Sequence, residues 1–443
     1  MTKTFAIHTL GCKVNQYESQ QLRQLLESLG LSLAQSGRQA DLIIVNSCCV
    51  TGTASAKSRQ SLRRLSSLNP NATLVLTGCL AVADLDELKS LAGHEVRIVP
   101  DKAKLAQAID DLIAFTTNVV VQNPSIPPSP DKIKDKNLLE SAKTASVLQP
   151  LRRFSGQSRA FLKIQDGCDA FCSYCIIPKI RTHVCNKDVK TVLIEAENLV
   201  SAGHKEIVLS GIFLGAYGQS TARRKHWNPE KRDALADLLE QLAAVPGLAR
   251  IRLSSLEPAD VTDRLLTVFT QYPSIMPHLH LPIQSGSPTI LKKMCRQYTL
   301  EDYFGVIEKV VAALDHPAIT TDIIVGFPGE TEADFAQTLD VAEQIGFAKI
   351  HVFPFSARKD TPAAKMPGKV NPAVIKARAE ALQAADNRLQ KQFRQQFIGH
   401  PVSVLVENLR PPRGRCERYF MVDLDKLPTA SKLQRGDIVS LIL

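Results

Sequence analysis

One short stretch with three cysteines constrains this chain more than any other feature. Cys168, Cys172 and Cys175 stand four and three residues apart within residues 167–175. A loop of this length can wrap three thiolates around one side of an iron-sulfur cluster, because cysteine thiolate is the usual protein ligand of such clusters. The fourth iron then has no protein ligand and is open to a small molecule. The same spacing suits a structural zinc site with Cys185 as the nearest fourth ligand, and spacing alone does not separate the two.

Composition and charge narrow the class of protein. The chain has 443 residues, 44% of them hydrophobic, which is ample for about two to four domains with packed cores. It begins without the apolar run and cleavage site of a signal peptide, and no apolar run reaches membrane-spanning length. We therefore expect a cytoplasmic protein in which ten cysteines indicate metal or cluster ligands. The net charge of +10 favours a polyanionic partner such as nucleic acid, although a basic enzyme can share it.

Residues 1–121 alternate strand-like and helix-like segments, which predicts an open parallel α/β sheet. The expected strands at residues 4–10, 42–46 and 73–77 run into Cys12, Cys48 and Cys79 respectively. Ligands of such sheets lie beyond the carboxyl ends of the strands. Any one of these cysteines is most simply a small buried residue. Three at equivalent positions favour convergence on a second cluster, with Cys49 as an alternative to its neighbour.

The middle of the chain predicts a linker and then a barrel. Residues 122–157 are rich in proline and charge, as a linker is. Residues 158–396 contain six apolar strands separated by helical segments, expected at 161–165, 206–210, 250–254, 278–283, 319–325 and 350–355. Repeated βα units of this number predict a partial (β/α)6 barrel with an open side, and the chemistry of such barrels lies at the carboxyl ends of the strands.

Polar residues and glycines follow several of these strands. Turn formation or helix capping explains many such residues equally well. Asp322 is harder to explain in that way, because a carboxylate beside an apolar run must find a partner. His278 and His280 alternate with leucines, as polar residues on one face of a strand do. The other residues on this expected rim are Ser210, Gly211, Ser255, Glu257, Gln284 and residues 326–330.

Residues 397–443 follow a polar helix expected at 372–397 and change to short β-segments at 402–406 and 437–442. A small β-barrel that presents arginines and aromatic rings is a common way to hold RNA, because cations contact phosphates while rings stack on bases. The same charge also fits a solvated surface, and we favour RNA. The residues concerned are Arg410, Arg413, Arg415, Arg418, Tyr419 and Phe420.

Six segments together carry a family resemblance: residues 10–15, 46–48, 77–79, 164–178, 280–286 and 322–330. In them the chain resembles the methylthiotransferases of the radical S-adenosylmethionine (SAM) superfamily, and most of all the branch that modifies threonylcarbamoyladenosine in transfer RNA. The cysteine loop, with Tyr174 before its last cysteine, looks like the cluster-binding signature of that superfamily. The resemblance covers nearly the whole chain and makes the zinc interpretation a minority one.

The resemblance implies two [4Fe-4S] clusters. Residues 168, 172 and 175 would hold one whose free iron binds SAM, and residues 12, 48 and 79 an auxiliary one whose free iron carries the sulfur to be inserted. Cleavage of SAM would give a 5′-deoxyadenosyl radical that removes hydrogen from carbon 2 of the adenine, where a methylthio group takes its place. The expected SAM contacts are Tyr174, Ser210, Gly211, Ser255, Glu257 and Gln284.

The family also implies partners and a C-terminal module. The substrate would be the anticodon arm of tRNA, and residues 397–443 resemble the RNA-binding TRAM module. A low-potential electron donor such as flavodoxin or ferredoxin and a sulfur donor are required, and we expect a monomer. Residues 181–187 depart from the usual basic, serine-rich continuation, and the C-terminal module is short.

These departures concern the RNA contacts. Isopentenyladenosine in tRNA and an aspartate of a ribosomal protein therefore stay open as substrates of the same chemistry. A non-catalytic RNA-binding protein with structural zinc is the alternative of another class.

Overall fold

The computed structural model describes residues 3–35, 40–83, 88, 96–100, 108 and 149–443. Most of the predicted linker, residues 122–148, lies outside this description. The chain forms two compact units, residues 1–151 and 152–443.

The first unit is a five-stranded parallel sheet, as the sequence predicts, in the order β2-β1-β3-β4-β5. Its two edge strands were not predicted, because they are only two and three residues long. The strands are β1 Thr4–Thr9, β2 Ser32–Leu33, β3 Leu42–Ser47, β4 Thr73–Gly78 and β5 Val96–Ile98. The helices are α1 Lys13–Ser28, α2 Gly52–Leu68 and α3 Cys79–Ala83.

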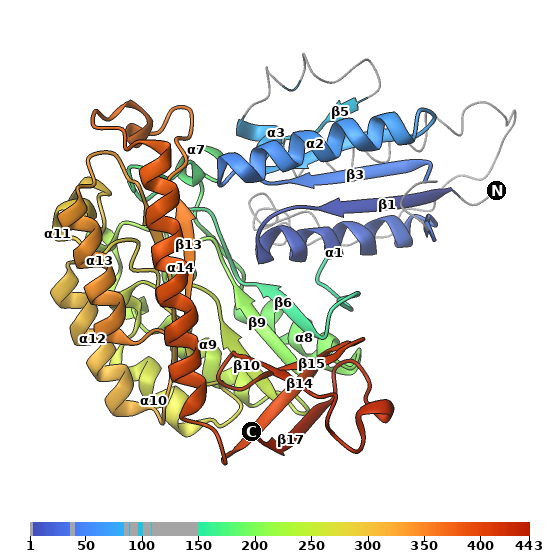
Figure 1. Cartoon of the computed structure of the whole chain (residues 1–443). Helices are drawn as coiled ribbons and strands as arrows, with labels where there is room; N and C mark the ends of the chain where they lie inside the picture. Colours follow the sequence, from blue (N-terminus) through green and yellow to red (C-terminus); the bar gives the residue numbers. More distant parts are fainter. Residues whose placement is uncertain (1–2, 36–39, 84–87, 89–95, 101–107, 109–148) are drawn as a thin grey trace, which may run out of the picture. The chain divides into compact units, whose positions relative to one another are not determined.

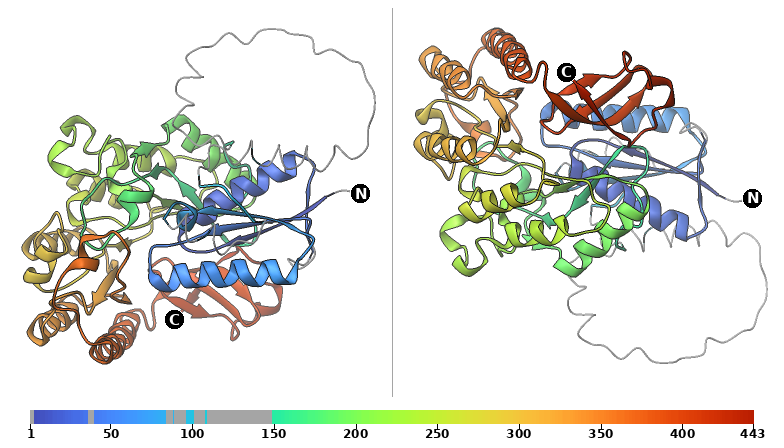
Figure 2. Two further views of the ribbon diagram at one scale, coloured as in Figure 1. Left: turned by 90° about the horizontal axis from the view of Figure 1, so that it is seen from above. Right: turned by 90° about the horizontal axis from the view of Figure 1, so that it is seen from below.

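Side chains alternate between the two faces of this sheet, and each face is covered. Phe5, Leu42 and Ile44 share one core with Leu22 and Leu26 of α1. Helix α2 lies on the opposite face (Figures 1 and 2). Strand β3 is buried along its whole length, so functional polar side chains fit better in the loop that follows its carboxyl end than in the strand itself.

The second unit contains the six predicted barrel strands, each pairing in parallel with its neighbours. They form two three-stranded sheets, β6-β9-β10 and β11-β12-β13, joined by single bridges such as Ser255 to His280. The strands are β6 Arg159–Lys163, β9 Glu206–Ser210, β10 Arg250–Leu253, β11 His278–His280, β12 Ala318–Val325 and β13 Lys349–Pro354. Among the described residues no pairing joins β13 to β6, so the barrel is partial.

Helices cover the outside of this barrel (Figure 1). They are α8 Val189–Ser201, α9 Ala234–Ala243, α10 Asp263–Gln271, α11 Pro288–Lys293, α12 Leu300–Ala313, α13 Glu332–Ile345 and α14 Pro372–Gln395, while the short helix α7 Ile177–Ile180 follows the cysteine loop. Several begin where a polar side chain caps the helix. Asp188, for example, accepts a hydrogen bond from the Thr191 amide at the start of α8. No helix in the described part of the chain is both long and apolar enough to cross a membrane.

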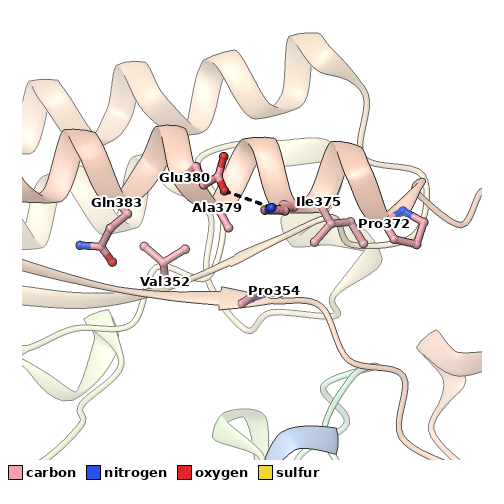
Figure 3. A pocket seen from close by; sticks show the side chains of 8 residues that line it. Val352, Pro354, Pro372, Ile375, Ala379, Glu380 and Gln383 are labelled. Atoms are coloured by element: carbon pink, nitrogen blue, oxygen red, sulfur yellow. Dashed lines mark ion pairs between the residues drawn. The ribbon is translucent and has the colours of Figure 1, made fainter.

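The outer face of β13 packs against α14 and leaves a shallow groove of about 430 Å³ between them (Figure 3). Val352 and Pro354 of the strand and Ile375 and Ala379 of the helix line it. Because side chains alternate along a strand, His351 lies on the opposite, inner face of β13.

The C-terminal strands form a four-stranded antiparallel sheet in the order β16-β15-β14-β17. These strands are β14 Pro401–Leu409, β15 Pro412–Cys416, β16 Met421–Asp423 and β17 Ile438–Ile442. The sheet is fastened to the barrel by two buried arginines of β10. Arg252 donates to the Cys416 and Glu417 carbonyls at 2.6 and 2.9 Å, and Arg250 donates to the Ser403 hydroxyl at 2.7 Å.

A buried carboxylate balances these arginines. Glu206 of β9 has no exposed surface and accepts hydrogen bonds from Arg252 at 2.8 Å and Arg250 at 3.4 Å, with Arg159 4.0 Å away. Burial alone would raise the pKa of Glu206, but Arg252, Arg159 and Arg250 outweigh it and hold that pKa below its ordinary value. Glu206 is therefore the buried counter-charge of Arg250 and Arg252 at this joint, while Arg159 also pairs with Glu407 of β14 at 2.8 Å.

Four of the residues expected to hold RNA turn out to face this joint. The ring of Tyr419 stacks on His278 at 4.1 Å, and Phe420 packs against Phe397. Arg415 pairs with Glu407 at 3.1 Å and Arg418 with Asp315 at 2.8 Å. The sequence could not show this, because an aromatic residue that stacks on RNA and one that closes a barrel look alike. Arg410 and Arg413 remain exposed.

We predict that Glu206→Gln destabilises the second unit by about 3–5 kcal/mol at pH 7, because it leaves buried guanidinium groups without their counter-charge. Urea unfolding followed by the fluorescence of Trp227, the one tryptophan in the sequence, measures this. A depressed pKa stabilises the fold above the unfolded value of 4.5, so the difference from wild type should shrink as the pH falls below 4.5.

The matched control is Glu380→Gln. Glu380 pairs with Lys376 at 3.8 Å and its side chain is 68% exposed. We expect this change to cost less than about 1 kcal/mol. Equal effects of the two substitutions would contradict the role given to Glu206.

Candidate active site

Three parallel strands of the first unit deliver the three predicted cysteines side by side. Strands β1, β3 and β4 are neighbours, and Thr9, Asn46 and Thr77 pair across them in register. Cys12 follows β1 as the capping residue of α1, Cys48 follows β3, and Cys79 follows β4 as the first residue of α3. The three cysteines thus leave the sheet at the same edge.

The first two loops are in direct contact. Gly11 has a φ of +95°, and a Cβ atom placed on it would lie 2.6 Å from Cys48 Cβ and 2.7 Å from Cys48 Sγ. Only glycine fits this position without moving the cysteine. The contact also shows that Cys48, of the adjacent pair with Cys49, faces the loop of Cys12.

A buried polar network holds these loops, and it includes Asn15 of the first resemblance segment. Asn15 donates to the Leu10 carbonyl at 2.8 Å and to the Ser47 carbonyl at 2.9 Å, tying the first loop to the second. Ser58 of α2 donates to the Cys48 carbonyl and accepts from the Cys48 amide. A helical asparagine or serine gives little sequence signal for such a role, because its partners are backbone atoms of another segment.

The three-cysteine loop of the second unit follows β6 and is closed at its base. Gly167 has a φ of +78°, and a Cβ there would lie 1.7 Å from the His183 carbonyl oxygen. The Cys168 amide donates to the Arg181 carbonyl at 2.9 Å, while Arg181 clasps Asp166 at 2.7 and 2.9 Å. The atypical residues after Pro178 therefore still support the loop.

The arrangement of donors in this loop fits a cluster better than a single ion. Burial and the nearby thiols of Cys175 and Cys172 raise the pKa of Cys168 to about 12, and burial and Cys172 raise that of Cys175 to about 12. With pKa values this high the groups are neutral thiols unless a metal ion or cluster binds them as thiolates. Among the described residues, however, no three cysteine sulfurs lie within 4.8 Å of one another, as they would around one zinc ion. A cubic cluster holds its thiolates farther apart, since each binds a different iron.

A buried ion network adjoins the loop. Arg296 lies with one nitrogen 3.2 Å from both Cys172 Sγ and the Tyr174 hydroxyl, and with the other 2.5 Å from Glu257. Arg224 holds the second oxygen of Glu257 at 3.1 Å and Asp260 at 2.7 Å. Sequence reasoning selected Tyr174 and Glu257 but missed both arginines, which lie in helical or irregular segments away from the motifs.

The other expected SAM contacts lie at the carboxyl ends of neighbouring strands. Ser255 is exposed and bridges to His280, while Gln284 adopts a φ of 67° and bridges to Ile323 beside Asp322. Gly211 packs against Gln165. Ser210 is buried and donates to the Val208 carbonyl at 3.3 Å, so its hydroxyl is engaged within its own strand. The rim is thus assembled as predicted for the barrel, and the individual SAM contacts stay predictions.

In comparisons with known proteins, each of the two units matches a family model. Residues 4–99 match the model described as uncharacterized protein family UPF0004, and residues 162–342 match the radical SAM superfamily. Among solved structures, the radical SAM methyltransferase TsrM from Kitasatospora setae, with cobalamin and a [4Fe-4S] cluster bound, superposes with a TM-score of 0.55 at 13% identity over 82% of this chain and 74% of that one. This likeness concerns the fold. Fold and cysteine loop together define a radical SAM protein.

Curated relatives define the family more closely. The threonylcarbamoyladenosine tRNA methylthiotransferase MtaB of Bacillus subtilis is 37% identical over 91% of this chain and 85% of its own length. The protein of the same name from Thermotoga maritima is 36% identical over 91% of this chain and 87% of its own length. The tRNA-2-methylthio-N(6)-dimethylallyladenosine synthase 1 of Mycobacterium marinum is 35% identical, with coverages of 91% and 75%. The chain belongs to the radical SAM tRNA methylthiotransferase family.

We predict that Gly11→Ala displaces Cys48 and lowers the iron content of anaerobically reconstituted protein by about half, because one of two four-iron clusters is lost. Iron and sulfide analysis measures the loss. Gly30→Ala is the control, since Gly30 also has a positive φ of +81° but no atom within 4 Å of the added Cβ. Equal iron loss in both variants would attribute the effect to backbone strain and contradict the contact with Cys48.

Proposed function

We propose that this protein inserts a methylthio group at carbon 2 of threonylcarbamoyladenosine in the anticodon arm of tRNA. The observation that carries the proposal is the pair of three-cysteine sites, one at the carboxyl edge of the first sheet and one on the first barrel loop. Relatives that cover most of the chain are named for this reaction. The enzyme uses SAM and [4Fe-4S] clusters, as its family does.

Each cysteine set is assigned one cluster. Cys168, Cys172 and Cys175 would hold the one that binds SAM, and residues 12, 48 and 79 the auxiliary one. When bound, the two clusters supply reductive SAM cleavage and the sulfur to be inserted. The protein contributes position: Asn15 and Gly11 set the spacing of the auxiliary loops, while Arg181 and Asp166 close the base of the SAM loop.

The surroundings of the SAM loop have separate tasks. Arg296 joins Cys172, Tyr174 and Glu257, so it orients a cluster ligand and two expected SAM contacts at once. Arg224 holds Glu257 in place through an ion pair at 3.1 Å. Gln284 and Ser255 present polar atoms at the next strand ends, where the nucleoside part of SAM would lie. Ser210 would serve by shaping the end of β9, since its hydroxyl is already used.

The remaining partners follow from the chemistry. Reductive cleavage requires a low-potential electron donor such as flavodoxin or ferredoxin, and turnover requires a sulfur donor. We infer a monomer that works in the cytoplasm, where tRNA is available.

The branch of the family decides the substrate. Relatives named for dimethylallyladenosine are 35% identical, only slightly less than those named for threonylcarbamoyladenosine. Isopentenyladenosine is therefore the second candidate, and an aspartate of a ribosomal protein the third.

The test is mass spectrometry of nucleosides from total tRNA of cells with and without this protein. We expect the methylthio form of threonylcarbamoyladenosine to disappear and its precursor to accumulate. Complementation with Cys12→Ala should fail in cells while the purified variant still releases 5′-deoxyadenosine, and Cys168→Ala should lose both activities. Loss of the methylthio-isopentenyl nucleoside instead would overturn the substrate, and full methylthiolation by Cys12→Ala would overturn the auxiliary site.

The exposed arginines of the C-terminal sheet give a separate prediction about RNA. Arg410→Ala with Arg413→Ala should weaken tRNA binding and reduce the slope of log K against log salt concentration by about two, because each arginine would neutralise one phosphate. Fluorescence anisotropy with labelled tRNA measures this. Lys376→Ala, on α14 and 79% exposed, is the control and should leave the slope unchanged. An unchanged slope in the double variant would show that these arginines do not contact the phosphates of tRNA.

A further inference from the structure

Three metal-ligating side chains that the proposed function does not use meet inside the barrel. His280 of β11, Asp322 of β12 and His351 of β13 each bring one ligand atom within 4.8 Å of the other two. Among the described residues this is the one group of histidine, cysteine and carboxylate side chains gathered so tightly. Asp322 is the carboxylate beside an apolar run that needs a partner, and two imidazoles lie next to it.

Strand register explains why the three converge. Asp322 and His351 are direct partners across β12 and β13, and His280 pairs with Thr320, two residues before Asp322 and on the same face. That face is opposite to the groove against α14 in Figure 3, so the cluster points to the inside of the barrel. All three side chains are only partly buried, which leaves room for a ligand.

The distances suit a bound ion. His280 Nε2 lies 3.3 Å from Asp322 Oδ1. Two ligands at about 2.0–2.1 Å from a tetrahedral ion are about 3.3–3.4 Å apart, so this pair already has the required separation. Two imidazoles and one carboxylate also form a common donor set for divalent transition metals, with further positions left for water or another oxygen ligand.

An outer contact orients the first histidine. Thr320 Oγ1 lies 2.9 Å from His280 Nδ1 and 3.1 Å from His278 Nε2. If the hydroxyl accepts from His280 and donates to His278, the Nε2 lone pair of His280 points toward Asp322. Metal-binding histidines are usually held in this way through the ring nitrogen that does not bind the metal.

We propose that His280, Asp322 and His351 form a binding site for a divalent transition metal ion such as Zn²⁺, separate from both cysteine sites. The site adjoins Ser255 and Gln284, because Ser255 bridges to His280 and the Gln284 amide donates to the Asp322 carbonyl at 2.9 Å. An ion there lies beside the strand ends that we assign to SAM. The inference rests on the barrel geometry and does not require the proposed tRNA reaction.

The experiment uses full-length protein reconstituted anaerobically with iron and sulfide, so that the cysteines are occupied, and then dialysed against Zn²⁺. Wild type should bind about one equivalent of zinc more than His280→Ala, His351→Ala or Asp322→Asn. Thr320→Val should keep the site but weaken it about tenfold, as loss of an outer contact does. His400→Ala, at an exposed histidine outside the barrel interior, is the control and should bind as wild type does.

Zinc-edge X-ray absorption identifies the ligands without using activity. We expect nitrogen and oxygen neighbours at about 2.0–2.1 Å, whereas cysteine-bound zinc would show sulfur at about 2.3 Å. Urea unfolding followed by Trp227 fluorescence shows whether each variant is folded, and the conservative Asp322→Asn keeps the test valid if an alanine variant is not. An equal zinc content in wild type and the folded variants would overturn the proposal, as would zinc bound by sulfur in all of them. His280, Asp322 and His351 would then be a hydrogen-bonded group without a metal ion.

Discussion

Parallel strand pairing is the constraint on which the cysteine site of the first unit and the rim of the barrel both depend. In a parallel sheet the carboxyl ends of all strands lie at one edge, so residues far apart in sequence meet there whenever neighbouring strands are in register. Thr9, Asn46 and Thr77 set that register in the first unit, and the cysteines follow within a few residues. The barrel uses the same rule for its rim. Chemistry that requires many donors in one place is thereby built from short local segments.

Such convergence buries polar groups, and these groups must find partners in both units. The first unit surrounds its cysteine loops with uncharged hydrogen bonds, as between Asn15 and the Ser47 carbonyl. The barrel uses ion pairs: Glu206 balances the arginines at its lower end, and Glu257 balances Arg224 and Arg296 beside the SAM loop. Each of these buried charges has a partner of opposite sign, because an unpaired charge inside the barrel would be costly.

Much of this could be predicted from the sequence, because local patterns determine it. The cysteine spacing in residues 168–175, the six barrel strands and the open parallel sheet all follow from periodicity and resemblance. The edge strands β2 and β5 were missed because they are too short for a pattern. The direction of Tyr419 could not be predicted, because it depends on His278 across the joint. The same holds for Arg296, whose contacts with Cys172 and Glu257 join three segments that carry no shared signal.

One end of the barrel interior is used for stability, and the other end carries the residues that we assign to function. At the end where the barrel strands begin, Tyr419 and the arginines of β10 join the barrel to the C-terminal sheet. Side chains of a type that could bind RNA are engaged in these contacts. At the upper end, the SAM loop and the strand ends of β10 and β11 stay accessible. Between them, His278 and His280 alternate on one strand face and share Thr320, one stacking downward on Tyr419 and the other reaching Asp322. A single hydroxyl thus links the structural closure of the barrel to the group that we propose as a metal site.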